Sequence, residues 1–219
     1  MTIIIGVVNQ KGGCAKTTST MQIGGELAVR GNRVGIIDMD KQGTATTWSG
    51  QADEDSPFPA TVFSLAAVGS KIFSEIKKHA PNYDFILIDC PPAIESEIPW
   101  NVLLCADLAI IPVMPAMDNV WASKEAKNLA VAAKQRNENL MIRLLPSRVP
   151  RGNAYQLCLN QMRNDPDCPM YINHLSDKIA YAESQILGTC ITSYAPKSTA
   201  AKEVRAVVDE ILADLAKGN

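Results

Sequence analysis

Segment 11–18 holds glycine, lysine and threonine residues in the order and spacing of a phosphate-binding loop. Gly12 and Gly13 carry no Cβ, so the backbone can approach phosphate oxygens closely. Lys16 supplies a positive charge to the β- and γ-phosphates, and the Thr17 hydroxyl is placed to ligate Mg²⁺. The segment predicts binding of MgATP. The residues expected to contact the nucleotide are Lys11, Gly12, Gly13, Cys14, Ala15, Lys16, Thr17 and Thr18.

Two aspartates follow apolar runs and are candidates for the same site. Asp38 ends the run 34–38, and Asp89 ends the run 85–89. Ligands of open α/β sheets bind at the carboxyl ends of strands, so Thr17, Asp38 and Asp89 are the residues expected to hold a hydrated magnesium ion. A helix cap or a turn former would explain either aspartate alone. Two such residues beside a phosphate loop favour the metal site.

The elements that must position these residues are short apolar runs that alternate with helical patterns. Near-continuous apolar runs are typical of strands buried on both faces of a parallel sheet. We expect strands at 3–8, 34–38, 85–89, 108–113, 141–145 and, more weakly, 190–193. We expect helices at 16–30, 73–79, 122–136, 154–162, 179–187 and 198–217. The alternation predicts one α/β domain, residues 1–219, with a doubly wound, mostly parallel sheet covered by helices on both faces, as in P-loop NTPases.

Composition and charge are those of an ordinary globular chain, with 47% hydrophobic residues, 20% charged residues and a formal net charge of −2. A dedicated nucleic-acid-binding protein would carry a basic excess, so contact with DNA would need a local patch. The apolar runs are too short for a membrane span or a signal peptide, which predicts a cytoplasmic protein. The six cysteines form no Cys-x-x-Cys pair, and we expect them to be small buried residues.

The last predicted helix has one apolar face at steps of three and four residues, formed by Val204, Val207, Val208, Ile211, Leu212 and Leu215. Such a face packs on a sheet or binds a membrane surface. Helices that bind membrane surfaces carry cationic polar faces, whereas this helix has four acidic residues against three basic ones. We therefore expect packing on the sheet and no membrane partner.

Three motifs resemble the deviant Walker A ATPases, and within them the ParA-type partition proteins, with MinD-type cell-division ATPases as cousins. The phosphate loop of that group, Lys-Gly-Gly-x-Gly-Lys-Ser/Thr, stands here as residues 11–17 with one departure. Its Asp-x-Asp-x-Gln-Gly motif is residues 38–43, and its apolar strand followed by Asp-x-Pro-Pro is residues 86–92. The resemblance covers nearly the whole chain.

The departure is Ala15, where the group normally has glycine. If this position needs a left-handed backbone, alanine costs about 1–2 kcal/mol. The property that the substitution puts in question is the rate of hydrolysis, because the charged and hydroxyl groups that bind nucleotide are all present.

The resemblance implies an ATPase that forms an ATP-dependent homodimer and hydrolyses ATP to ADP and phosphate. Lys11, Lys16 and Asp40 are the implied catalytic residues: Lys11 reaches across the dimer to the partner's phosphates, and Asp40 positions the attacking water. Lys11 could instead fold over the phosphates of its own subunit. The implied adenine pocket lies at the strand end that holds Pro146 and Arg148.

The resemblance further implies that the ATP-bound dimer binds nonspecific DNA, associates with the nucleoid and is released when a centromere-binding adaptor stimulates hydrolysis. The chain begins at its first strand, as in the small class of these proteins, which lacks an N-terminal DNA-binding extension. DNA contacts would then come from basic residues on the surface, although scattered lysines are also typical of a solvated face. The candidates are Lys178, Lys197, Lys202 and Arg205.

Three other classes of function stay open. A MinD-like ATPase that cycles on membranes would need a cationic amphipathic C-terminus. A relative of the nitrogenase iron protein would need cysteines at a dimer axis, for which Cys90 and Cys105 are the candidates, but the glycine-rich cysteine segments of that group are absent from the sequence. A noncatalytic nucleotide switch is disfavoured by Asp38, Asp40 and Asp89 and mildly favoured by Ala15.

Overall fold

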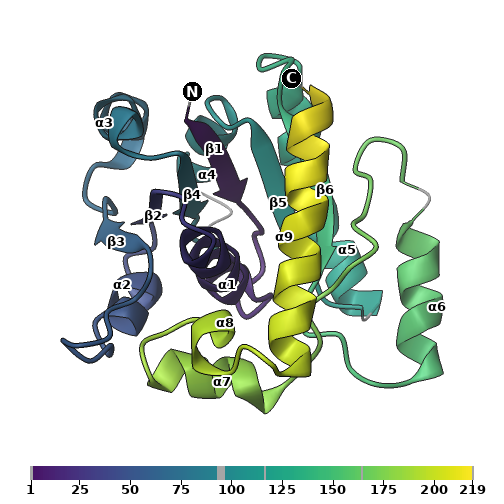
Figure 1. The fold of residues 1–219 in the computed structure, drawn as a ribbon. Helices are drawn as coiled ribbons and strands as arrows, with labels where there is room; N and C mark the ends of the chain where they lie inside the picture. The colour runs from purple at the N-terminus through teal and green to yellow at the C-terminus, as the bar shows by residue number, and fades with distance from the viewer. Residues whose placement is uncertain (1, 93–96, 116, 164, 219) are drawn as a thin grey trace.

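The computed structural model describes residues 2–92, 97–115, 117–163 and 165–218, and a six-stranded sheet forms its centre (Figure 1). The strand order is β3-β2-β4-β1-β5-β6, and all the neighbouring strands pair in parallel. The strands are β1 (Ile3–Val7), β2 (Val34–Asp38), β3 (Thr61–Ser64), β4 (Phe85–Asp89), β5 (Leu108–Val113) and β6 (Met141–Pro146). The predicted parallel α/β sheet is confirmed.

Helices cover both faces of the sheet, as expected for a doubly wound fold. They are α1 (Lys16–Val29), α2 (Thr44–Ser49), α3 (Ile72–His79), α4 (Ile98–Leu103), α5 (Met117–Lys134), α6 (Asn153–Met162), α7 (Ile179–Ile186), α8 (Ile191–Tyr194) and α9 (Thr199–Gly218). Figure 1 shows α1 and α9 side by side on one face, with α7 and α8 at the end of the sheet to which β1 points.

Successive side chains along each strand point to opposite faces of the sheet, and each face packs in its own hydrophobic core. Ile5 and Val7 pack in the core under α1 and α9, whereas Ile86 and Ile88 pack in the core under α3, α4 and α5. The predicted apolar face of the last helix lies in the first core, since Val204, Val207, Val208 and Ile211 are fully buried and Leu215 is 6% exposed. Packing on the sheet is therefore confirmed as the use of that face.

The expectation of a strand at 190–193 is wrong, because residues 191–193 lie in the short helix α8 and Cys190 is its N-cap residue. A segment of four residues has no periodicity that separates a buried strand from a buried helix turn. The sixth strand is instead β3, at the edge of the sheet, with an exposed residue at each end. Helices α2 and α4 were not expected either, since six residues are too few to show a helical period.

The cysteines follow the expectation of small buried residues in five of six cases, and Cys105 is partly exposed. Among the residues that the structure describes, no group of three or more histidine, cysteine or acidic side chains is arranged to hold a metal ion. Within the same part of the chain, no helix is both long enough and apolar enough to cross a membrane.

Candidate nucleotide-binding site

The loop between β1 and α1 has the backbone of a phosphate-binding loop. Two of its residues take left-handed conformations, Gly13 with φ 74° and Ala15 with φ 69°. The Ala15 carbonyl accepts a 2.8 Å hydrogen bond from the Ser19 amide, so the left-handed residue lies where α1 begins. Ala15 thus has a backbone conformation that favours glycine. A left-handed alanine destabilises the folded state by about 1–2 kcal/mol, the cost expected from the sequence for this position.

Asn9 anchors the start of this loop, a role that the motifs did not reveal. Its side chain is 5% exposed, and its Nδ2 donates a 2.7 Å hydrogen bond to the Pro112 carbonyl in β5. Its Oδ1 accepts a 3.1 Å bond from the Lys11 amide. An amide side chain directly after an apolar strand is the signal that could have identified it, because buried polar groups need partners.

Lys16 points into the interior of the loop. It is 7% exposed, and its Nζ donates to the Lys11 carbonyl at 3.3 Å and lies 3.9 Å from Cys14 Sγ. An ammonium group held beneath backbone amides is well placed for phosphate oxygens. Cys14 is buried beside it, and burial raises the pKa of its thiol.

Thr17 and Asp89 form the closest side-chain contact of the site. Thr17 Oγ1 donates to Asp89 Oδ2 at 2.6 Å, and Asp89 is 1% exposed. Burial raises the pKa of the Asp89 carboxyl to about 7; the Thr17 hydrogen bond opposes this shift, and the charge of Asp38 adds to it. Asp89 Oδ1 is buried and accepts no hydrogen bond from the described residues. Hydroxyl and carboxylate oxygens are the ligands that Mg²⁺ prefers, so this pair fits magnesium or the water that it carries.

Asp38 lies next to Asp89, since the two are register partners at the ends of β2 and β4. Both oxygens of its fully buried carboxylate accept bonds from its own chain. Oδ1 accepts from the Asp40 amide at 3.1 Å, and Oδ2 accepts from the amide and hydroxyl of Thr46 at 3.0 and 3.2 Å. These contacts are those of a turn former, the alternative that the sequence left open, and a role through magnesium-bound water stays a proposal.

The phosphate loop borders a cavity of about 450 Å³, which is within the usual range of ligand sites. Eight predicted site residues line it: Gly12, Gly13, Ala15, Lys16, Thr17, Thr18, Asp40 and Arg148. Lys11, Cys14, Asp38, Asp89 and Pro146 are described by the structure but do not line this cavity. The segment before α7 and α7 itself form another wall of the cavity, which was not predicted as part of the nucleotide site. Its residues are Ser176, Asp177, Lys178, Tyr181, Ala182 and Gln185.

The end of β6 meets this wall at the rim of the cavity. Arg148 takes a left-handed backbone with φ 50°, and its Nε lies 3.5 Å from Asp177 Oδ1. Both side chains are about half exposed, so the pair contributes little to stability. Pro146 is buried, and its carbonyl accepts a 3.0 Å bond from the Leu175 amide. Pro146 is therefore a buried support of this wall, and Arg148 lies at the rim of the cavity. Their expected contacts with adenine stay a prediction.

The four predicted DNA contacts differ in their surroundings. Lys178 lines the nucleotide cavity and forms an ion pair with Glu203. Lys197, just before α9, and Lys202, in its first turn, are both exposed. A cation that is already paired adds less to a phosphate-binding surface, so Lys197 and Lys202 are the better candidates of these three.

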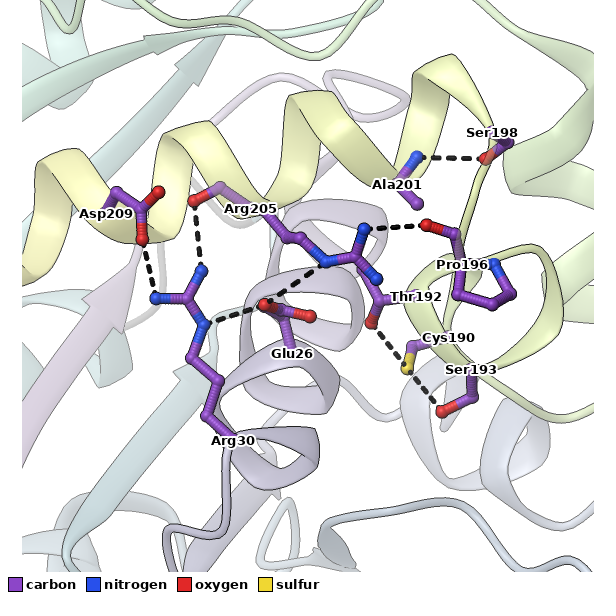
Figure 2. A network of polar contacts seen from close by, with 10 residues as sticks. All are labelled: Glu26, Arg30, Cys190, Thr192, Ser193, Pro196, Ser198, Ala201, Arg205 and Asp209. Carbon is purple, nitrogen blue, oxygen red and sulfur yellow. Dashed lines mark hydrogen bonds and ion pairs between the residues drawn. The ribbon is translucent and has the colours of Figure 1, made fainter.

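Arg205 belongs to a network that joins α1 to α9 (Figure 2). Its Nε lies 3.9 Å from the buried Glu26, and its Nη1 donates to the Pro196 carbonyl at 2.6 Å. Arg30 completes the network with a 2.7 Å contact to Glu26 and a 2.6 Å contact to Asp209. The guanidinium of Arg205 thus helps to hold α9 against α1. Its expected contact with DNA stays a prediction.

Comparisons with known proteins agree with this geometry. The model of the CobQ/CobB/MinD/ParA nucleotide binding domain matches residues 5–203. The maintenance of carboxysome distribution protein A of Halothiobacillus neapolitanus is 26% identical over 211 residues, which cover 95% of each chain. The chromosome-partitioning ATPase Soj of Thermus thermophilus is 23% identical over 242 residues, again 95% of each chain. The solved septum site-determining protein MinD of Pyrococcus horikoshii, complexed with Mg-ADP, has a TM-score of 0.77 at 21% identity and 96% coverage of both chains.

Proposed function

Because this chain belongs to the CobQ/CobB/MinD/ParA family of nucleotide-binding proteins, as a ParA-type ATPase, we propose that it is a DNA-partition ATPase that dimerises on MgATP and binds nonspecific DNA. The observation that carries the proposal is the cavity that Lys16 and Thr17 of the phosphate loop line together with Asp40 and Arg148. Its polar groups converge from separate strands on one space of nucleotide size.

The described residues divide the work of ATP hydrolysis among them. Lys16 holds the β- and γ-phosphates by charge, and the left-handed Gly13 turns the backbone of the loop around them. Thr17 and Asp89 would hold magnesium, which neutralises phosphate charge when bound. Asp40 lies at the cavity, with its amide fixed by Asp38, and is the residue to orient the attacking water.

Lys11 is proposed to act on the partner subunit's nucleotide. Its backbone amide donates a hydrogen bond to Asn9 Oδ1. Lys11 is not among the described residues that line the cavity of its own subunit. A lysine at the edge of the loop can complete a second site only if another copy approaches this face. Charge stabilisation of the transition state is then supplied in trans, as by an arginine finger.

The cargo of such an ATPase would be chosen by an adaptor protein. Similarity to a chromosome-partitioning ATPase supports DNA bound by a centromere-binding adaptor. Similarity to a carboxysome distribution protein supports a second candidate, the positioning of a protein body by the same DNA-binding cycle. A membrane-cycling function is disfavoured because the apolar face of α9 is buried against the sheet.

The deciding experiment is a gel-shift series on the full chain with two unrelated duplexes and three states: a nonhydrolysable ATP analogue, ADP and no nucleotide. We expect binding of both duplexes only with the ATP analogue. Binding that does not depend on nucleotide, or no binding at low salt, contradicts the proposal. Purified adaptor candidates added to the same protein then separate the two cargo classes by stimulation of ATP turnover.

A further inference from the structure

One wall of the nucleotide cavity is fastened to α9 by two glutamates that lie seven residues apart on one face of that helix. Glu210 accepts bonds from the amides of Ile172 and Asn173 at 2.8 and 3.0 Å, and from Asn173 Nδ2 at 2.9 Å. Glu203 accepts hydrogen bonds from residues further along the same segment, between Ser176 and Tyr181. The segment 172–181 therefore lies on α9 through carboxylate contacts at both of its ends.

Of the two carboxylates, Glu203 has the larger number of bonding partners. It accepts a 3.1 Å bond from the Ser176 amide and a 2.7 Å bond from the Ser176 hydroxyl. It also accepts a 3.0 Å bond from the Tyr181 hydroxyl and forms the ion pair with Lys178. Although burial acts in the opposite direction, the bonds from Lys178 and Ser176 lower the pKa of the Glu203 carboxyl. The group is a charged, multiply bonded anchor at neutral pH.

The two anchors differ in what they hold. Ser176, Lys178 and Tyr181, the partners of Glu203, all line the nucleotide cavity. Ile172 and Asn173, the partners of Glu210, do not line it. Both glutamates fasten the same segment to the same helix, so a purely structural role would make them equivalent. Only Glu203 acts on the wall that faces the phosphate loop.

We propose that Glu203 is a positioning residue for the nucleotide: it holds the Ser176–Lys178–Tyr181 wall at the distance from the phosphate loop that the nucleotide needs. This inference rests on the proposed nucleotide site. Holding the wall in place before binding removes an ordering cost that a loose wall would pay with each ligand, and a preorganised site binds more tightly for that reason. Glu203 itself does not line the cavity, so its action passes through its three partners.

The effect of a substitution follows from these contacts. Glu203→Ala removes the common acceptor and leaves the Lys178 ammonium beside the cavity without its ion-pair partner. Glu203→Gln keeps one carbonyl oxygen for Ser176 and can donate to the Tyr181 oxygen, but it loses the charge that holds Lys178. We therefore expect the glutamine variant to bind nucleotide with an affinity between those of the wild type and the alanine variant.

The test compares Glu203→Ala, Glu203→Gln and the matched control Glu210→Ala in the full chain. The readouts are the Kd of a fluorescent ATP analogue, the thermal unfolding midpoint and ATP turnover at saturating ATP. We expect Glu203→Ala to raise Kd about tenfold with little change in saturated turnover, and Glu210→Ala to change Kd less than about twofold at a similar loss of unfolding midpoint.

Equal effects of the two alanine variants on Kd, or an unchanged Kd in Glu203→Ala, overturn the inference. If Glu203→Ala does not fold, Glu203→Gln is compared with Glu210→Gln, and a Kd raised only by the former supports the inference, whereas equal Kd values overturn it. Failure of the wild-type chain to bind the analogue would instead overturn the proposed nucleotide site, so the two failures are distinguishable.

Discussion

The Thr17 hydroxyl donates a 2.6 Å hydrogen bond to the Asp89 carboxylate, which joins the first turn of α1 to the end of β4. The other Asp89 oxygen is buried and accepts no hydrogen bond from the described residues. A buried carboxylate with one free oxygen is costly unless it is protonated or bound by a cation. This pair therefore links the protonation, the metal binding and the stability of the site.

The unfolding midpoint should respond to Asp89→Asn in a pH-dependent way. Burial raises the pKa of folded Asp89 to about 7, so the folded state keeps a proton that the unfolded state loses above about pH 4. Stability from this group thus falls as pH rises toward 7. Asparagine does not titrate, so the unfolding midpoint of the variant, relative to that of the wild type, should rise as pH increases from about 4 to about 7 and level off above that, without Mg²⁺ or nucleotide. A difference that is constant with pH contradicts the buried, protonated Asp89.

Lys16 and Asp40 should separate nucleotide binding from hydrolysis. Lys16→Ala removes the buried ammonium of the loop and is expected to abolish ATP binding in equilibrium titrations. Asp40→Ala is expected to leave binding intact and to suppress turnover, because Asp40 lines the cavity and is the residue proposed to orient the attacking water. The same loss of nucleotide affinity in both variants would show that the assigned roles are wrong.

Ala15→Gly should stabilise the protein. Ala15 has φ 69°, where glycine has no Cβ to clash, so the variant is expected to gain about 1 kcal/mol in free energy of unfolding. Ala132→Gly, on the exposed side of α5, is the matched control and should lose about 1 kcal/mol, because the same change in a helix interior adds backbone freedom to the unfolded chain. Denaturant unfolding measures both values. Loss of stability in both variants would rule out strain at Ala15.

Substitution of Lys11 should prevent the ATP-dependent dimer from forming. Lys11→Ala should still bind nucleotide, since Lys11 does not line its own cavity, but should fail to form the dimer in the presence of a nonhydrolysable ATP analogue. Light scattering after size exclusion gives the mass. A dimer that persists undiminished in the variant would return Lys11 to the phosphates of its own subunit.

Sequence reasoning predicted the strands of the central sheet and the phosphate loop because both rest on local patterns. Continuous apolar runs identified five of the six strands, and the order of glycine, lysine and threonine identified the loop. The edge strand β3 and the helix α8 were missed because four residues carry no period. The wall around Ser176 and Tyr181 was missed because only tertiary packing on Glu203 brings it opposite the loop.

The same limit applies to the predicted DNA contacts. Lysine and arginine counts do not show which cations are paired inside the fold. Lys178 pairs with Glu203, which lies 25 positions away on α9. Arg205 pairs with Glu26, which lies on α1, and no local pattern reveals either pair. Lys197 and Lys202 are the candidates that stay exposed.

Lys197 and Lys202 should carry DNA binding by the ATP-bound dimer. Their combined replacement by alanine should weaken binding equally on unrelated duplexes, because contacts to phosphates carry no sequence information. It should also reduce the dependence of affinity on salt, since each lost phosphate contact removes a counterion-release term, and a dimer loses them from both subunits. The control replaces Lys77 and Lys78 by alanine; both are exposed on α3, and their loss removes the same charge. This control should leave the affinity for DNA, and its dependence on salt, close to those of the wild type. Gel shifts over a salt series with an ATP analogue measure both quantities, and light scattering checks that the dimer still forms. Equal weakening by the two pairs would mean that only net charge matters, and binding that Lys197 and Lys202 do not affect would place the DNA surface elsewhere on the dimer.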